Sequence, residues 1–119
     1  MPPTAPLTIA TSSVQRLVKE EASYHRELEE QKKRVAKLES ETGADEDGNR
    51  EFLLKQEQRA ADETKAVLPT LKQKIKDALA KLEQLIVEEG HKGSESNVEQ
   101  LTAAKEAVSQ AMTALREVS

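Results

Sequence analysis

Two places in this sequence have residue types that could hold a metal ion. In the first, His25 follows Glu21 by four residues and precedes Glu29 by four, which puts the three side chains on one face of a helix. Charged residues four positions apart are also commonplace on exposed helix surfaces. We therefore interpret His25 as a surface residue beside acids. The other histidine, His91, lies in a glycine-flanked stretch that is typical of a turn.

The second place is an acidic stretch in which Asp45, Asp47 and Asn49 resemble the start of a calcium-binding loop. In such a loop the sixth residue is glycine and the twelfth is a glutamate that binds the ion with both oxygens. Here these positions hold Arg50 and Gln56, so the match fails at both. An acidic turn explains the stretch better.

No group of residues points to catalysis. The sequence has no cysteine, which excludes thiolate chemistry and disulfides. It has no glycine-rich loop of the kind that binds phosphates. Its carboxylates have Lys or Arg nearby in the sequence, which favours solvated surface pairs over a buried acid and base. We therefore predict a protein that is not an enzyme and has no catalytic, cofactor-binding or metal-binding residues.

Basic and acidic residues are balanced along most of the chain. The 119 residues carry a formal charge of −4, and residues 14–42 and 52–89 each hold seven basic and seven acidic residues. The acidic excess lies mainly in residues 43–51. Without a basic stripe we expect no nucleic acid and no membrane among the partners. No apolar run approaches the roughly 20 residues that span a bilayer, and the first residues lack a secretory signal, so we expect a cytoplasmic protein.

The spacing of hydrophobic residues predicts long helices around a thin aliphatic core, since 34% of residues are charged and only 2% are aromatic. The first helix is expected to follow the cap candidates Ser12 and Ser13 and to end near residue 41. Its apolar residues recur in steps of three and four, as in a coiled coil. They are Val14, Leu17, Tyr24, Leu28, Val35 and Leu38. The polar residues Glu21 and Gln31 occupy the two positions of this seam, the face expected to pack against other helices, that lack an apolar residue. Residues 1–11 contain three prolines and are expected to form a flexible arm.

A polar turn with two glycines, over residues 41–49, should reverse the chain into a second helix over about 50–89. The stripe of that helix comprises Leu53, Ala60, Thr64, Val67, Leu71, Ile75, Ala78, Leu82 and Leu85. Its doubled step of four, Val67–Leu71–Ile75, is a stutter that contains Pro69. Because proline removes an amide donor and its ring meets the carbonyl four residues earlier, we expect a bend or break near Pro69.

A third helix is predicted near the end of the chain. Gly90 is a candidate for a left-handed cap that ends the second helix. Ser96 and Glu99 have the spacing of a capping box that begins the third. The stripe of this helix comprises Val98, Leu101, Lys105, Val108, Met112 and Leu115.

Together the three segments predict an all-α fold, namely an antiparallel up-down-up three-helix bundle with coiled-coil-like packing and a middle helix bent near Pro69. Residues 12–119 are expected to form one domain. A dimer built from a hairpin of the first two helices is the alternative.

Two segments resemble the tubulin-folding cofactor A family, also called tubulin-specific chaperone A. The first is VQRLVKEEASY at residues 14–24, and Gln15 departs where the family usually has a base. Its matching residues are Val14, Arg16, Leu17, Lys19, Glu20 and Tyr24. The second is VLPTLKQKIKDALAKLEQLI at residues 67–86, with Pro69 inside the helix, and Phe52 stands where the family commonly has an aromatic residue.

The resemblance covers about residues 14–89, whereas the third helix matches only in length and periodicity. Proteins of this family are three-helix bundles that capture quasi-native β-tubulin after its release from the chaperonin. They hold it apart from α-tubulin, ahead of heterodimer assembly. The resemblance therefore implies β-tubulin and other tubulin-folding cofactors as partners, no nucleotide or metal cofactor, and a cytoplasmic, cytoskeleton-associated protein. The chain itself is expected to be a monomer or a homodimer.

The resemblance also indicates site residues. Arg16, Lys19 and Glu20 are the first candidates for the β-tubulin contact, although ordinary solvated surface explains them as well. Tyr24 and Pro69 are assigned structural roles. The alternative function is a generic coiled-coil scaffold or tether that self-associates to position other proteins. Capture of β-tubulin without α-tubulin would discriminate between the two.

Overall fold

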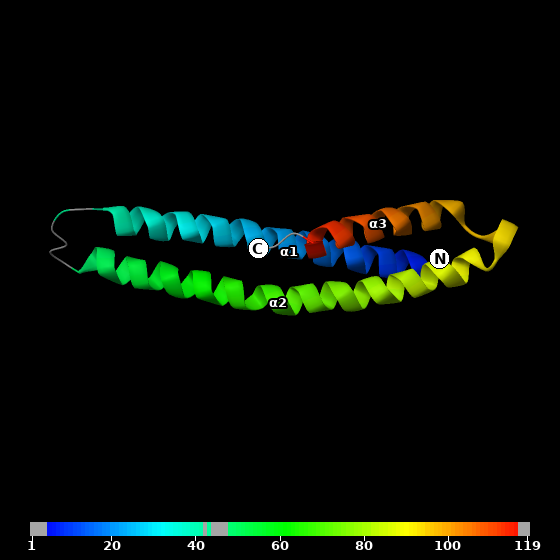
Figure 1. The fold of residues 1–119 in the computed structure, drawn as a ribbon, viewed down its shortest axis with the longest axis horizontal. Helices are drawn as coiled ribbons and strands as arrows, with labels where there is room; N and C mark the ends of the chain where they lie inside the picture. Colours follow the sequence, from blue (N-terminus) through cyan, green and yellow to red (C-terminus); the bar gives the residue numbers. More distant parts are fainter. Residues whose placement is uncertain (1–4, 42, 44–47, 117–119) are drawn as a thin grey trace. The chain divides into compact units, whose positions relative to one another are not determined.

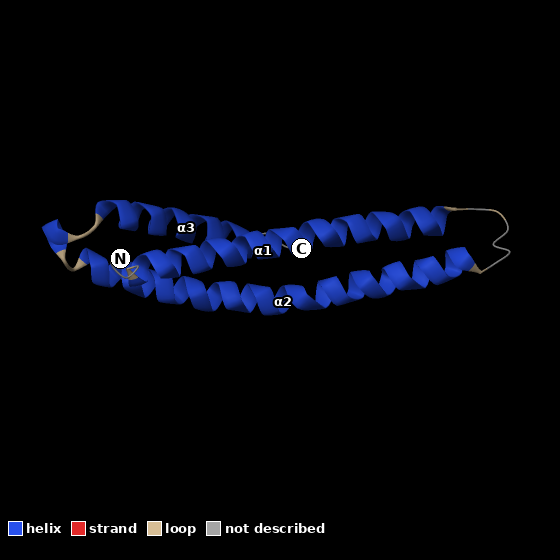
Figure 2. Ribbon diagram, turned by 180° about the vertical axis from the view of Figure 1, so that it is seen from behind, coloured by secondary structure: helices blue, strands red, loops and turns tan. Residues whose placement is uncertain are grey.

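The structure is a computed structural model that describes residues 5–41, 43 and 48–116. These residues form helices and loops, with no strand among them, which confirms the all-α three-helix fold (Figures 1 and 2). The helices are α1 (Pro6–Ser40), α2 (Asn49–Gly90), the short 3-10 helix η1 (Gly93–Glu95) and α3 (Val98–Arg116). Their up-down-up order along the whole chain stays a prediction.

The first helix begins earlier than predicted. Its first residue is Pro6, whereas the prediction began it after the serines at 12–13. Proline suits this position, because the first helical amide has no partner in the helix and the ring fixes φ near the helical value. The expectation of a flexible arm is therefore wrong from Pro6 onward, and Leu7 and Ala10 are buried core residues. Residues 1–4 lie outside the described part of the chain.

The chain divides into two compact units. Unit 1 comprises Met1–Ala22 and Leu71–Ser119, and unit 2 comprises Ser23–Thr70. The helices α1 and α2 contribute to both units, whereas α3 belongs to unit 1 alone. The single domain expected over 12–119 stays a prediction.

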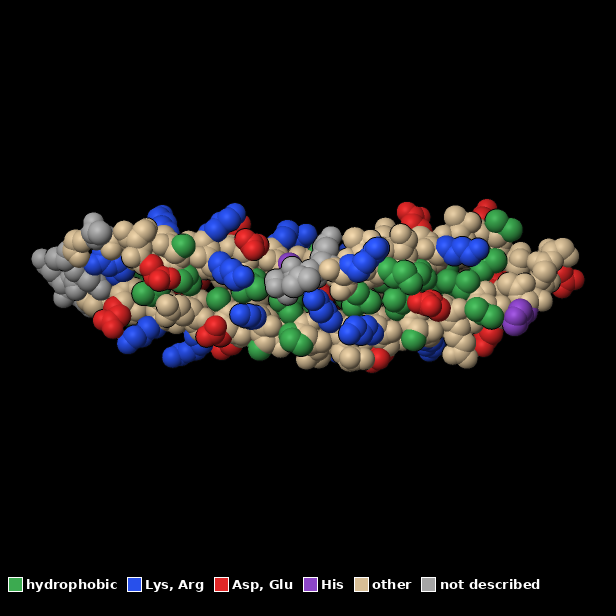
Figure 3. Space-filling model, viewed as in Figure 1, with side chains coloured by type: hydrophobic (Ala, Val, Ile, Leu, Met, Phe, Trp, Pro, Cys, Tyr) green, Lys and Arg blue, Asp and Glu red, His purple; other side chains and the backbone are tan. Residues whose placement is uncertain are grey.

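Unit 1 has a hydrophobic core formed by all three helices. Its largest side chains with no exposed surface are Val14, Ile75 and Leu82. Around them are buried Leu7, Ala10, Leu79, Ala104, Ala107 and Ala111. On the face drawn in Figure 3, hydrophobic side chains show between rows of charged ones. Burial of one Val, Leu or Ile contributes roughly 1.5–3 kcal/mol, so these aliphatic side chains stabilise unit 1.

The core face of α3 is displaced by one residue from the predicted stripe. Ala104 and Ala111 are fully buried, whereas Lys105 and Met112, which the stripe placed in the core, are exposed. Val98 is 71% exposed, so its predicted burial is wrong as well. Alanine carries a single methyl group and allows close approach between helices. Its small side chain also gives a weak hydrophobic signal, so the spacing of the larger neighbouring residues predicts a different face.

The described residues of unit 2 form two helical segments, residues 23–40 of α1 and 49–70 of α2, and no third helix. Its few buried residues are half polar, namely Leu28, Leu68, Gln31 and Thr64. The Thr64 hydroxyl donates to the Ala60 carbonyl over 3.0 Å, whereas Gln31 Oε1 has no hydrogen-bond partner among the described residues. The predicted interruption of the α1 seam at Gln31 is therefore confirmed, as is the one at Glu21 in unit 1.

The buried face of α2 differs from the predicted stripe at three turns. Leu53 is 38% exposed, and Leu79, which the stripe did not include, is buried while Ala78 is only partly buried. Leu68 is buried, whereas Val67 is 36% exposed. Both residues are apolar, and sequence spacing alone did not show which of them faces the core. The predicted stutter around Pro69 is consequently wrong, and the doubled step of four falls after the proline, at Leu71–Ile75–Leu79.

The helix α2 is unbroken through Pro69, so the predicted break does not occur (Figure 1). Pro69 is exposed. The carbonyl of Lys65 loses its helical donor at this proline, but Lys65 is exposed too, so water can replace the missing amide. A bend at this position stays a prediction.

The connection from α2 to α3 is built differently from the predicted one. Gly93, with φ of +61°, adopts the left-handed conformation that was expected of Gly90. Asn97 rather than Ser96 caps α3, because the Gln100 amide donates to Asn97 Oδ1 over 3.0 Å. The Ser96 hydroxyl instead donates to the Gly93 carbonyl over 2.7 Å and closes η1.

Candidate binding surface

The three residues predicted to bind a partner lie on the solvent side of α1 in unit 1. Arg16, Lys19 and Glu20 are exposed, while Val14 and Leu17 on the other side of the helix contact the core. None of the three charged side chains forms a hydrogen bond or ion pair with another described residue. Their charges are therefore available to a partner, and their role in binding stays a prediction.

The two residues predicted to have structural roles lie in unit 2. Tyr24 is half-buried in α1, as its seam position implies, and Pro69 is an exposed residue of α2. These positions do not decide whether either residue matters for binding, so both roles stay predictions.

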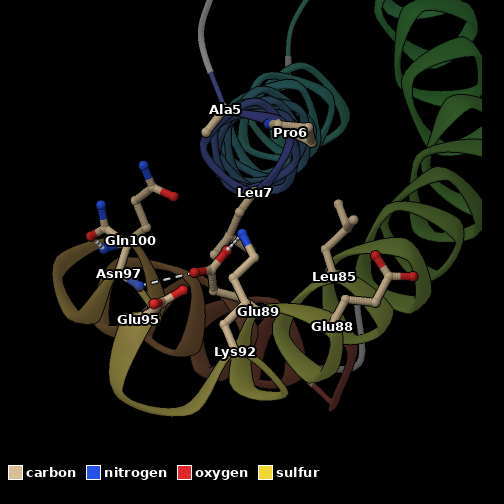
Figure 4. A pocket seen from close by; sticks show the side chains of 10 residues that line it. All are labelled: Ala5, Pro6, Leu7, Leu85, Glu88, Glu89, Lys92, Glu95, Asn97 and Gln100. Atoms are coloured by element: carbon tan, nitrogen blue, oxygen red, sulfur yellow. Dashed lines mark hydrogen bonds and ion pairs between the residues drawn. The ribbon is translucent and has the colours of Figure 1, made fainter.

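A polar network joins the end of α2 to the start of α3 (Figure 4). The carboxylate of Glu89 accepts a hydrogen bond from the Asn97 backbone amide over 2.9 Å and an ion pair from Lys92 Nζ over 3.0 Å. The bond from Asn97, reinforced by Lys92, lowers the pKa of Glu89 below its ordinary value. Since Asn97 is the residue that caps α3, Glu89 fixes the point at which that helix begins.

A hollow of about 430 Å³ lies beside this network in unit 1. The start of α1, with Pro6 and Leu7, forms one side of the hollow, and Leu85, Glu88 and Glu89 of α2 form another (Figure 4). The carboxylate of Glu89 is already engaged by Lys92 and Asn97. Glu89 is therefore not free to act as a ligand for a molecule in this hollow.

No three His, Asp or Glu side chains in the described part of the chain are close enough together to hold a metal ion. The metal interpretation of His25 thus gains no support. The calcium-like motif has its first residues, Asp45 and Asp47, outside the described residues. Among the helices that the structure describes, none is long and apolar enough to cross a membrane.

Charge in unit 1 is segregated along the chain, a feature that the prediction of balanced charge did not include. Residues 71–82 of α2 hold four lysines and one acid, whereas residues 83–106 hold six acids and two lysines. Over residues 52–89 the lysines of the first stretch are balanced by acids of the same range, so the total charge of that range is zero. A window of a dozen residues reveals the two stretches, and Figure 3 shows acidic side chains near the end where α2 passes into η1.

Comparison with known proteins identifies relatives. Residues 2–108 match the family profile described as tubulin binding cofactor A. A protein of Saccharomyces cerevisiae named tubulin-specific chaperone A is 38% identical over 80 residues, which cover 67% of this chain and 71% of that protein. No solved structure matches the chain significantly.

Proposed function

The chain belongs to the tubulin binding cofactor A family, and from this premise we propose that it captures quasi-native β-tubulin after chaperonin release and holds it ahead of heterodimer assembly. The observation that carries the proposal is the family match over residues 2–108. Members of this family are tubulin chaperones and not enzymes, so the function is one of binding and release.

A physical mechanism accompanies the proposal. A β-tubulin chain without α-tubulin exposes the surface that its partner would cover. A helical protein with charged faces can mask such a surface reversibly, because exposed ion pairs contribute only about 0–1 kcal/mol each and exchange readily. Arg16, Lys19 and Glu20 are suited to such contacts, since they are exposed and engage no described residue.

The wider setting follows from this role. Other tubulin-folding cofactors are the partners that would receive the captured β-tubulin. The cytoplasm, in association with the cytoskeleton, is where the exchange would take place. The chain would act as a monomer or a homodimer.

The proposal is tested by capture from a cell lysate with the full chain immobilised. We expect β-tubulin to be retained without α-tubulin, and size-exclusion chromatography would give the oligomeric state alongside. Equal retention of α- and β-tubulin would contradict the β-tubulin specificity. Self-association without tubulin capture would favour a scaffold or tether.

The site is tested by reversing all three charges together, as R16E/K19E/E20K. We expect weaker capture with an unchanged helical circular dichroism signal, because all three residues are exposed and the substitutes are good helix formers. If the variant captured as much β-tubulin as the parent, the contact would have to lie on another face of the protein.

The proposal for Pro69 is that it shapes the outer surface of α2 offered to β-tubulin. A mid-helix proline costs about 3 kcal/mol relative to alanine, so stability alone does not select it. Pro69→Ala should leave the fold stable or more stable and should weaken capture. Capture as tight as that of the parent would show that the proline is merely tolerated.

A further inference from the structure

The lysine-rich part of α2 in unit 1 is a charged surface to which nothing above assigns a role. We call Lys72, Lys74, Lys76 and Lys81 the basic segment. The only acid within residues 71–82 is Asp77, and its Oδ1 accepts a hydrogen bond from the side-chain amide of Gln73 over 2.9 Å. Thus the acid that lies within the basic segment is engaged by a neutral group.

Most of the basic segment is available to a partner. Lys74, Lys76 and Lys81 are exposed, and none of the three forms an ion pair or hydrogen bond with any other described residue. The ion pairs elsewhere in the structure show the contrast, since Lys33, Lys55 and Lys92 each contact a glutamate three or four residues away.

The helix spacing places these lysines in two rows. Lys72 and Lys76 are four residues apart, and Lys74 and Lys81 are seven apart, so each pair lies along one side of α2. The buried residues Leu71, Ile75 and Leu79 face the core between the rows. A partner that binds the solvent side of α2 would therefore have one row of lysines at each edge of the surface it covers.

From this arrangement we infer that the basic segment docks a carboxylate-rich surface of the captured protein. The inference rests on the proposed function, which makes that protein β-tubulin. Complementary charge is the feature that such a surface would recognise, because it speeds encounter and orients the partner. A nucleic acid is anionic too, and the family match, which is to a tubulin-binding cofactor, favours the protein surface over it.

The experiment compares two full-length variants with matched charge. K74Q/K76Q/K81Q neutralises three lysines of the basic segment, and K32Q/K33Q/K37Q neutralises three exposed lysines of α1 in unit 2. Both change the net charge equally, and glutamine is as good a helix former as lysine. Circular dichroism and thermal melting establish that each variant is folded.

For the first variant we expect β-tubulin capture to weaken about tenfold, since several exposed ion pairs act together. The control should change less than about threefold. Capture by the parent should fall as the salt concentration rises above about 0.1 M. A poly-glutamate peptide should compete with β-tubulin for the parent. Residual capture by K74Q/K76Q/K81Q should respond to neither salt nor the peptide.

The outcomes distinguish failure of the proposed function from failure of the basic segment as the docking surface. If the parent captures no β-tubulin, the proposed function fails and this inference fails with it. If the parent captures β-tubulin and the two variants bind alike, or the control is weaker, only the inference is overturned. Tight binding of duplex DNA by the parent, abolished in the first variant, would overturn it in favour of a nucleic acid.

Discussion

The two units use the same pair of helices and differ in what surrounds them. In unit 1 a third helix covers the α1–α2 seam, and Val14, Ile75 and Leu82 lose all contact with solvent. In unit 2 the seam has no third helix, and its buried positions include Gln31 and Thr64. A two-helix seam remains partly open to water, so it tolerates polar residues that a closed core would exclude. We therefore expect the apolar contacts of unit 1 to contribute more to the free energy of unfolding than those of unit 2.

The strongest test of this comparison is truncation of one leucine in each unit. Leu82→Ala should destabilise the protein by ~3–5 kcal/mol, because Leu82 is fully buried in a three-helix core that cannot easily collapse around the cavity. Leu28→Ala should cost ~2–3 kcal/mol, because the two-helix seam can close or admit water. Chemical denaturation monitored by circular dichroism measures both, and equal losses would erase the distinction.

Enlarging a buried alanine tests the closeness of the α3 packing. Ala107→Leu should destabilise by ~1–3 kcal/mol, because Ala107 has no exposed surface and its site has no room for three more carbon atoms. The control, Ala103→Leu, lies at an exposed position of the same helix and should stay within about 0.5 kcal/mol of the parent. A neutral Ala107→Leu would mean that α3 packs loosely.

A substitution in unit 2 should act in the opposite direction. Gln31→Leu removes a buried carbonyl oxygen that has no partner among the described residues, so stability should rise by about 1 kcal/mol. The exposed Gln58→Leu is the control and should change little. A loss of stability in Gln31→Leu would indicate that this amide contributes a favourable interaction, such as one with water.

The smallest effect is expected at Glu89, and it depends on pH. Its folded-state pKa is lowered by the Asn97 amide and by Lys92, so its contribution is complete above the unfolded pKa and is lost as pH falls through the lowered value. Glu89→Gln should therefore flatten the fall in melting temperature below about pH 4.5. Parallel pH profiles of parent and variant would contradict this assignment.

Sequence reasoning predicted the features that depend on large side chains at regular spacing. The α1 seam follows the predicted positions from Val14 to Leu38, including polar Glu21 and Gln31, because steps of three and four on a long helix leave one face to bury. The same periodicity predicted three helices. Together with the glycines that flank α2, it also predicted both ends of that helix to within a residue or two.

The rest depended on contacts that sequence spacing does not contain. Leu68 and Val67 are both apolar, and only packing shows which of them is buried. The alanine face of α3 was overlooked because small side chains give little signal. Arg16, Lys19 and Glu20 could be predicted as exposed, but the network of Glu89 links residues eight apart through a turn whose geometry a sequence does not show.

The alanine face of α3 determines the order in which unit 1 comes apart. Its fully buried side chains are the single methyl groups of Ala104, Ala107 and Ala111, and its larger apolar side chains Leu101, Val108 and Leu115 are only partly buried, whereas α1 and α2 contribute fully buried Val14, Ile75 and Leu82. Hydrogen bonds of Asn97 and Glu89 join its first turn to α2, whereas at its last described residue Arg116 Nε donates only to the Met112 carbonyl of the same helix. Amide hydrogens of α3 should thus exchange with solvent through opening that starts at the Arg116 end, while the α1–α2 pair is still closed.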